Sequence, residues 1–93
     1  MEIFAVQYFY GASPEELDAI RPIHREWMGK FLESGELLAS GPMLDNPQAL
    51  LIFKSESIDA LGKLLDNDPF EIAGFISSRT IQRWNPVFGP FSS

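Results

Sequence analysis

His24 is the only histidine in a chain of 93 residues that has no cysteine. A general base that works near neutral pH without a large pKa shift must therefore be His24. It lies about one helical turn before Trp27 and Met28, at the edge of an apolar stripe rather than toward solvent. A lone histidine in such a place is also typical of a partly buried structural residue. Both interpretations stay open on the sequence alone.

Asp68 is the second candidate, and it follows directly after a predicted helix in the segment Asp66-Asn67-Asp68-Pro69-Phe70. An aspartate before a proline commonly caps or turns the chain. A carboxylate that paired with His24 across two helices would instead orient the imidazole, set its tautomer and stabilise its charged form. The sequence offers a His24–Asp68 acid–base pair as one hypothesis and an Asx turn as the other.

Ser40, Gly41 and Pro42 form a third candidate feature, at the end of a predicted strand. The Ser40 hydroxyl could donate a hydrogen bond to a ligand, and Gly41 would allow close approach of the backbone. The same residues are also typical of an ordinary strand end. No Gly-x-Ser-x-Gly elbow surrounds Ser40, so an acyl-enzyme nucleophile is not expected.

Arg21 and Arg25 flank His24 in the sequence. Their guanidinium groups could bind a substrate anion. Pairing with acidic neighbours on the helix surface is the more ordinary role, and the available neighbours are Glu16, Asp18 and Glu26.

Charge and composition exclude several classes of function. Seven Lys and Arg against thirteen Asp and Glu give a net charge of -6, so the field of the protein repels phosphate backbones and anionic lipid surfaces. We therefore expect neither nucleic-acid nor membrane binding. The first residues, Met1-Glu2-Ile3-Phe4, lack the basic start of a signal peptide, and no apolar stretch reaches the length of a bilayer span. A cytoplasmic protein is the expectation.

Cofactor chemistry has no support in the sequence. The absence of cysteine excludes disulfides, thiolate nucleophiles and iron–sulfur clusters. None of the seven glycines belongs to a GxGxxG motif or a P-loop. The acidic residues show no ligand spacing for zinc or calcium; those considered are Asp45, Asp59, Asp66 and Asp68. We predict no metal site and no cofactor.

The elements that must position these residues begin with a strand over residues 2–10, rich in aromatic and branched side chains and predicted to be buried on both faces. A helix then starts with Ser13 as N-cap, Pro14 at its first position and Glu16 closing a capping box, and it ends at Gly35. Pro22 predicts a kink or two abutting helices. The predicted apolar stripe consists of Leu17, Ile20, Ile23, Trp27, Phe31 and Leu32.

The rest of the chain predicts a hairpin of strands 36–40 and 48–54, a helix over 57–66, a helical turn near 71–74 and a strand over 76–84. This order predicts one domain, 1–93, of the α+β class: a ferredoxin-like βαββαβ sandwich with a four-stranded antiparallel sheet and both helices on one face. Such a fold leaves the other face of the sheet open. A homodimer through that open face is the expected way to cover it.

Three motifs in this order resemble the YciI-like, or YCII-related, family. They are Arg21-Pro22-Ile23-His24, then Gly35-Glu36-Leu37-Leu38-Ala39-Ser40-Gly41-Pro42, then Asp68-Pro69-Phe70 followed by Ala73-Gly74. The resemblance spans nearly the whole chain and implies a ferredoxin-like subunit that dimerises into an α/β barrel. It also implies a pocket between sheet and helices. Matched motif to motif, His24 and Asp68 fall on the family's His–Asp pair, and Ser40 falls on a small residue that lines the pocket.

The resemblance further implies proton-transfer chemistry on small cyclic molecules. Most members lack an assigned reaction, but a characterised relative is a dehydrochlorinase for a chlorinated hydroxyhydroquinone, and similar barrels include muconolactone isomerases and polyketide-type cyclases. The loop between Pro42 and Gln48 is shorter here than in many members, so the rim of the pocket is expected to differ.

Two functions follow from the sequence. The first is a cofactor-independent lyase or isomerase in which His24 transfers a proton on a small cyclic or aromatic-derived substrate and Asp68 orients it. The alternative is a non-catalytic module of the same fold that binds a small ligand or assembles with a partner protein.

Overall fold

The computed structural model describes residues 1–92. Its elements in chain order are β1 (Glu2–Tyr10), α1 (Pro14–Ser34), β2 (Leu37–Pro42), β3 (Gln48–Ser55), α2 (Ile58–Leu65), α3 (Pro69–Ile72) and β4 (Ile76–Arg83). The predicted succession of strands and helices is confirmed.

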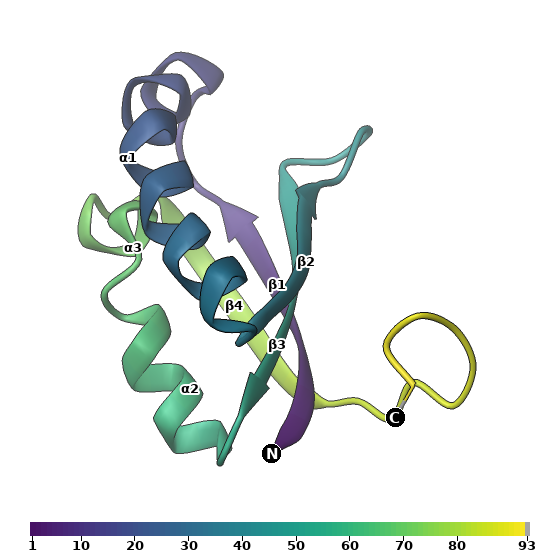
Figure 1. Cartoon of the computed structure of the whole chain (residues 1–93). Helices are drawn as coiled ribbons and strands as arrows, with labels where there is room; N and C mark the ends of the chain where they lie inside the picture. Colours follow the sequence, from purple (N-terminus) through teal and green to yellow (C-terminus); the bar gives the residue numbers. More distant parts are fainter. Residues whose placement is uncertain (93) are drawn as a thin grey trace.

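The four strands form one antiparallel sheet in the order β2-β3-β1-β4. All the helices lie on the same side of this sheet (Figure 1). This is the predicted ferredoxin-like α+β sandwich. Because β1 lies between β3 and β4, alternate side chains of β1 project from the middle of the sheet toward the helices.

The prediction that β1 is buried on both faces is wrong for the single chain. Phe4, Val6 and Tyr8 are at most 1% exposed and pack under the helices. The alternate residues Ile3 and Ala5 lie on the other face of the sheet and keep part of their surface in solvent. The helices cover only one face, so Ile3 and Ala5 stay partly exposed on the second face, where Ile52, the partner of Ala5 in β3, is the buried exception at 5% exposed.

Helix α1 has the predicted termini. The Ser13 side chain accepts a hydrogen bond from the Glu16 backbone, the Glu16 side chain accepts one from the Ser13 backbone, and Pro14 stands at the first position. Gly35 ends the helix with a φ of 85°, in the left-handed region that favours glycine. The helix continues through Pro22 as a single element, so the expectation of two abutting helices is wrong.

The buried face of α1 is rotated from the predicted stripe. Ile23 and Leu32 are 57% and 60% exposed. The residues that face the sheet are Leu17, His24 and Met28, with Phe31 packed against the same core. Leu17, His24 and Met28 are separated by seven and four residues, spacings that keep side chains on one face of a helix. The side chain of Ile23 points about 100° away from that of His24 around the helix axis. The histidine therefore belongs to the inward face itself rather than to its edge.

The element boundaries differ most from the prediction at β2 and α3. Strand β2 does not stop at Ser40 but continues through Gly41 and Pro42. It is an edge strand that pairs only with β3, and an edge strand can hold a proline because not every backbone N–H is needed for pairing. The short helix α3 begins at Pro69 instead of residue 71, because Asp68 caps it.

The segment after β4 leaves the sheet on the side away from the helices and forms a loop there (Figure 1). Trp84 and Phe91 close this loop through an edge-to-face contact with ring centroids 6.3 Å apart. Val87 and Phe88 are exposed. In the part of the chain that the structure describes, no helix is both long and apolar enough to span a membrane.

Candidate active site

The structure brings His24 and Asp68 together, although 44 positions separate them in the sequence. His24 projects from α1 toward the sheet, and its Nε2 lies 3.1 Å from Asp68 Oδ2. Asp68 is fully buried and the His24 side chain is 14% exposed. The pair therefore sits where the inner face of α1 meets the start of α3.

The Asp68 carboxylate is held by donors from three different elements. The Tyr8 hydroxyl of β1 donates to Oδ2 at 2.9 Å, the same oxygen that contacts His24. The Phe70 backbone N–H donates to Oδ1 at 2.8 Å, which is the Asx turn that caps α3. Both interpretations of Asp68 therefore describe real contacts, since one oxygen caps the helix and the other reaches the histidine.

These contacts define the tautomer of His24. With Asp68 as a carboxylate, which can only accept hydrogen bonds, Nε2 carries the proton that lies between His24 and Asp68. The free lone pair is then on Nδ1. Within residues 1–92 no buried side-chain nitrogen or oxygen lacks a partner, and Nδ1 has no partner there, so Nδ1 must be accessible to solvent. The two ring nitrogens exchange the roles they have in the Ser-His-Asp triad, where Nδ1 faces the carboxylate.

Aromatic rings fix the plane of the imidazole. The Phe70 ring stacks on His24 with centroids 4.0 Å apart and an interplanar angle of 17°. The Trp27 ring is also roughly parallel to the imidazole, with ring centroids 6.4 Å apart and an interplanar angle of 27°. The imidazole can therefore neither tilt away from Asp68 nor turn freely, which is the positional control that a proton-transfer group needs.

His24 lies on a cavity of about 400 Å³ between α1 and the β2-side half of the sheet. Its lining residues are Tyr8, Tyr10, Arg21, His24, Arg25, Met28, Gly29, Leu32, Leu37, Ala39, Ser40, Gly41, Pro42, Ala49 and Leu51. Ser40, Gly41 and Pro42 thus share one cavity with His24. Asp68 does not line it, because it lies behind the imidazole. A cavity of this size can hold a small cyclic molecule.

Sequence reasoning missed Tyr8 and Phe70. The sequence places Tyr8 only in a buried strand; the available signal is its hydroxyl, because a buried tyrosine normally finds a hydrogen-bond partner. Phe70 supplies both a stacking ring and a backbone donor to the pair. For the arginines, the expected surface pair is present between Arg21 Nε and Asp18 Oδ1 at 3.2 Å, yet Arg21 and Arg25 also reach the cavity.

Both tyrosines of the chain belong to this site, and their ionisation is suppressed. Burial raises the pKa of Tyr8, and the nearby Asp68 carboxylate raises it further through its charge and its hydrogen bond. Burial also raises the pKa of Tyr10, with Arg21 opposing and Asp68 adding to the shift. Tyr8 therefore remains protonated and donates to Asp68 at every pH below about 10.

We expect tyrosinate absorbance to stay absent in the folded protein when the pH is raised past about 10, the ordinary tyrosine value. Both folded-state pKa values are raised, so the native state keeps protons that the unfolded state releases above that pH. The tyrosine contribution to stability is complete below about pH 10 and declines as the pH rises further. Ultraviolet difference spectra and circular dichroism, recorded together, should show tyrosinate appearing with unfolding. Reversible ionisation of both tyrosines near pH 10 with native dichroism would contradict the buried geometry.

No group of three or more His, Cys, Asp or Glu side chains within residues 1–92 is arranged to hold a metal ion. The lining side chains with polar groups are His24, Ser40, Arg21, Arg25, Tyr8 and Tyr10, and the Tyr8 hydroxyl among them already donates to Asp68. The site can therefore bind a polar ring and exchange a proton with it.

Solved structures share this fold. The 5-chloro-2-hydroxyhydroquinone dehydrochlorinase from Burkholderia phenoliruptrix, solved in complex with 2,5-dihydroxybenzoquinone, has a TM-score of 0.79 and 22% identity, over 89% of this chain and 93% of that one. An antibiotic biosynthesis monooxygenase has a TM-score of 0.60 and 20% identity, over 91% and 97% of the two chains. A NIPSNAP family protein from Agrobacterium tumefaciens has a TM-score of 0.57 and 18% identity, over 97% and 94%.

Among curated proteins, no sequence matches the chain. The family model of the YCII-related domain matches residues 1–85 and thus includes every residue of the site described above. That span covers most of the chain, and the resemblance seen in the three sequence motifs is confirmed. The chain belongs to the YCII-related domain family.

Proposed function

We propose that the protein is a cofactor-independent enzyme that transfers protons on a small cyclic enol or hydroxyquinone, with His24 as the catalytic base. The observation that carries the proposal is the placement of the imidazole, which is bound to the buried Asp68 through Nε2 and open at Nδ1. His24 also lines the cavity of about 400 Å³. Asp68 acts as the positioning residue, because it touches His24 and not the cavity.

Proton transfer needs no further reagent in this arrangement. Nδ1 accepts a proton from an O–H or C–H group of the substrate, and Asp68 stabilises the imidazolium that forms. The same nitrogen returns the proton to another substrate atom. In a chlorinated hydroquinone, two hydroxyl protons leave, one returns to the carbon that bears chlorine, and chloride departs with the electrons of the C–Cl bond. The net change is loss of HCl with formation of a quinone, which requires no external oxidant.

Ser40, Gly41 and Pro42 are proposed as the substrate-binding wall. They line the cavity from the edge strand β2, facing the helix that carries His24. The Ser40 hydroxyl can donate to a substrate oxygen or accept from a substrate hydroxyl. Open space lies beside Gly41, since a Cβ built on it would meet no atom within 4 Å.

The test incubates the protein with 5-chloro-2-hydroxyhydroquinone under anaerobic conditions and measures the release of chloride. This compound is taken from the name of the dehydrochlorinase with the same fold. Binding is followed separately with 2,5-dihydroxybenzoquinone and the NMR signals of His24 and of the amides of Ser40 and Gly41. Release above the uncatalysed rate supports the proposal. Binding without any release from this or related halogenated hydroquinones favours the second function below.

The second candidate is a non-catalytic ligand-binding module. It is favoured by the observation that the Asp68 contacts tie β1, α1 and α3 together, as a purely structural network would. In that case a ligand should raise the melting temperature without being turned over. Substitution of His24 should then change the affinity or the melting temperature only.

We also propose that two copies of the chain associate through the face of the sheet that the helices leave open. Ile3, Ala5, Phe9 and Leu50 belong to this face and are partly exposed in the single chain. A domain this small buries a limited share of its surface, so a second copy is the natural cover for an apolar sheet face.

The expected result is a dimer by light scattering at micromolar concentration. Ala5→Arg places a charge in the middle of the open face and should give a monomer, whereas Lys63→Gln, on the exposed side of α2, should leave the dimer intact. A monomeric wild-type protein under these conditions would overturn the dimer proposal without affecting the proposal for His24.

A further inference from the structure

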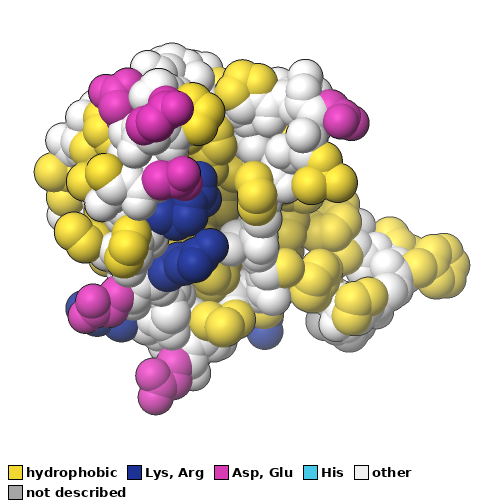
Figure 2. Space-filling view, turned by 90° about the horizontal axis from the view of Figure 1, so that it is seen from above, with side chains coloured by type: hydrophobic (Ala, Val, Ile, Leu, Met, Phe, Trp, Pro, Cys, Tyr) yellow, Lys and Arg dark blue, Asp and Glu magenta, His cyan; other side chains and the backbone are white. Residues whose placement is uncertain are grey.

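The charge of the cavity is opposite to the charge of the protein. The chain has a net charge of -6, with thirteen acidic residues. None of those acidic residues lines the cavity, whereas Arg21 and Arg25 both do. Seen from above in Figure 2, basic side chains lie near the middle of the molecule, with an acidic side chain against them and hydrophobic side chains on either side. The cavity is thus a locally positive site on a negative protein.

Arg21 is held in place beside the imidazole. Its Nε donates to Asp18 Oδ1 at 3.2 Å, and its guanidinium carbon lies 5.9 Å from the centroid of the Phe70 ring. The same ring stacks on His24. Because its own side chain is 29% exposed and Asp18 is 71% exposed, the ion pair with Asp18 is weak and leaves guanidinium N–H groups for another acceptor.

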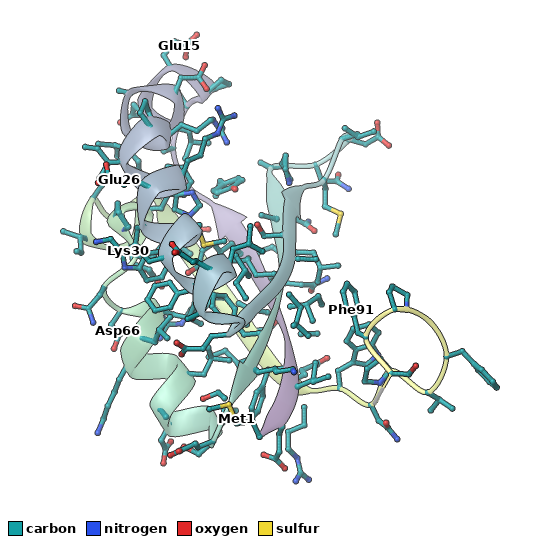
Figure 3. The ribbon with its side chains drawn as sticks, viewed as in Figure 1. Met1, Glu15, Glu26, Lys30, Asp66 and Phe91 are labelled. Carbon is teal, nitrogen blue, oxygen red and sulfur yellow. The ribbon has the colours of Figure 1, made fainter. Side chains whose placement is uncertain are left out.

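Arg25 carries a charge that the protein does not compensate. Within residues 1–92 it forms no ion pair, and Glu26, the acidic side chain next to it, lies on the side of α1 turned away from the sheet (Figure 3). Arg21 and Arg25 are four residues apart on one helix, a spacing at which like charges repel and destabilise the helix. An anion bound between them would remove this repulsion.

We propose that the cavity selects a small cyclic anion, an enolate or a ring carboxylate, whose negative oxygen is bound by Arg21 and Arg25 while the ring lies against His24. The inference rests on the proposed function for the role of the cavity and adds the charge state of the substrate. The two guanidinium groups stabilise negative charge on oxygen, and the imidazole is left to move the proton on carbon. A neutral ring of the same shape binds more weakly.

The test compares two ligands that differ in charge and hardly in shape. One is 1,3-cyclohexanedione, which is an enolate at neutral pH, and the other is its O-methyl enol ether, which is neutral. Dissociation constants come from NMR titration of the Gly29 and Gly41 amides, which border the cavity. We expect the enolate to bind about 10-fold more tightly than the ether at low salt, and we expect added salt to reduce this preference.

The decisive variant is Arg21→Gln/Arg25→Gln, in which the preference should disappear while the affinity for the ether is retained. The control Lys63→Gln/Arg83→Gln removes the same amount of charge from exposed positions that do not line the cavity, and the preference should persist in it. Equal binding of enolate and ether by the wild-type protein would overturn the inference, as would a preference that survives in the double arginine variant.

These outcomes are separable from the fate of the proposed reaction. His24→Gln keeps both guanidinium groups, so it should retain the enolate preference whether or not His24 is a base. If chloride release fails but the arginine variants lose the preference, the anion site stands and the reaction does not. If release occurs and the preference is absent, the reaction stands and the anion site does not.

Discussion

Replacing His24 with glutamine is expected to lower kcat/KM for chloride release by about 100 to 10,000-fold, the range that a positioned general base contributes. The glutamine amide can still donate to Asp68, as Nε2–H does in the native site, but it has no basic nitrogen. The fold should therefore remain, at a loss of about 1 kcal/mol from the ring stacking on Phe70. Steady-state kinetics and thermal unfolding check the two parts separately.

A matched control is available one position away. Ile23→Ala alters an exposed side chain on the same turn of α1 and should leave kcat/KM unchanged. His24→Ala offers a second check, because added imidazole should restore part of the lost rate if a missing base is the cause. A folded His24→Gln protein with wild-type kcat/KM would exclude the proposed role of the imidazole.

Asp68→Asn is expected to lower the rate of chloride release by a similar factor, through a change in the tautomer of His24. The Oδ1 atom can still accept from the Phe70 N–H, which leaves the new amide group where Oδ2 contacts His24 and Tyr8. An amide donor facing Nε2 forces the imidazole proton to Nδ1, so the nitrogen open to solvent loses its lone pair. In the serine-protease triad the equivalent change costs about 10,000-fold in kcat. We expect a loss of about 1,000 to 10,000-fold here.

The tautomer itself can be measured, since the chain has one histidine and gives one imidazole signal set. Nitrogen-15 NMR should report the proton on Nε2 in the wild-type protein and on Nδ1 in Asp68→Asn. The Tyr8 hydroxyl must also find a new orientation, which should lower the free energy of unfolding by about 1 to 3 kcal/mol. Asp59→Asn, an exposed carboxylate on α2, serves as the control. An unchanged tautomer together with lost activity would show that Asp68 acts in some other way.

The order of elements was predictable because each boundary carries a local signal. Ser13, Pro14, Glu16 and Gly35 mark the ends of α1 through caps that depend only on neighbouring residues. The alternation of apolar side chains and the turn residues located the strands in the same way. The ferredoxin-like sandwich then followed from the few arrangements that a βαββαβ chain can adopt.

The parts that failed depend on contacts distant in the sequence. Neighbouring positions 23 and 24 can each belong to the inward face of α1, and the sequence does not decide between them. Packing on the sheet turns His24 inward and leaves Ile23 exposed. The hydrogen bond from Tyr8 to Asp68 joins residues 60 positions apart, and no local sequence pattern at either residue predicts it. The motifs could therefore nominate His24 and Asp68, but only the packed fold defines which nitrogen faces the carboxylate.

The two sides of the cavity are built from parts of the fold with different freedom to change. The His24–Asp68 pair depends on the central strand β1 and on the helices, where most substitutions would disturb the core. The opposite wall belongs to β2, which pairs on one side only and leads into the exposed loop of Met43 to Pro47. Insertions or deletions in that loop can reshape the opening while the His24–Asp68 pair is inherited unaltered. A lineage built on this plan can thus change which ligands enter the cavity without rebuilding the buried pair.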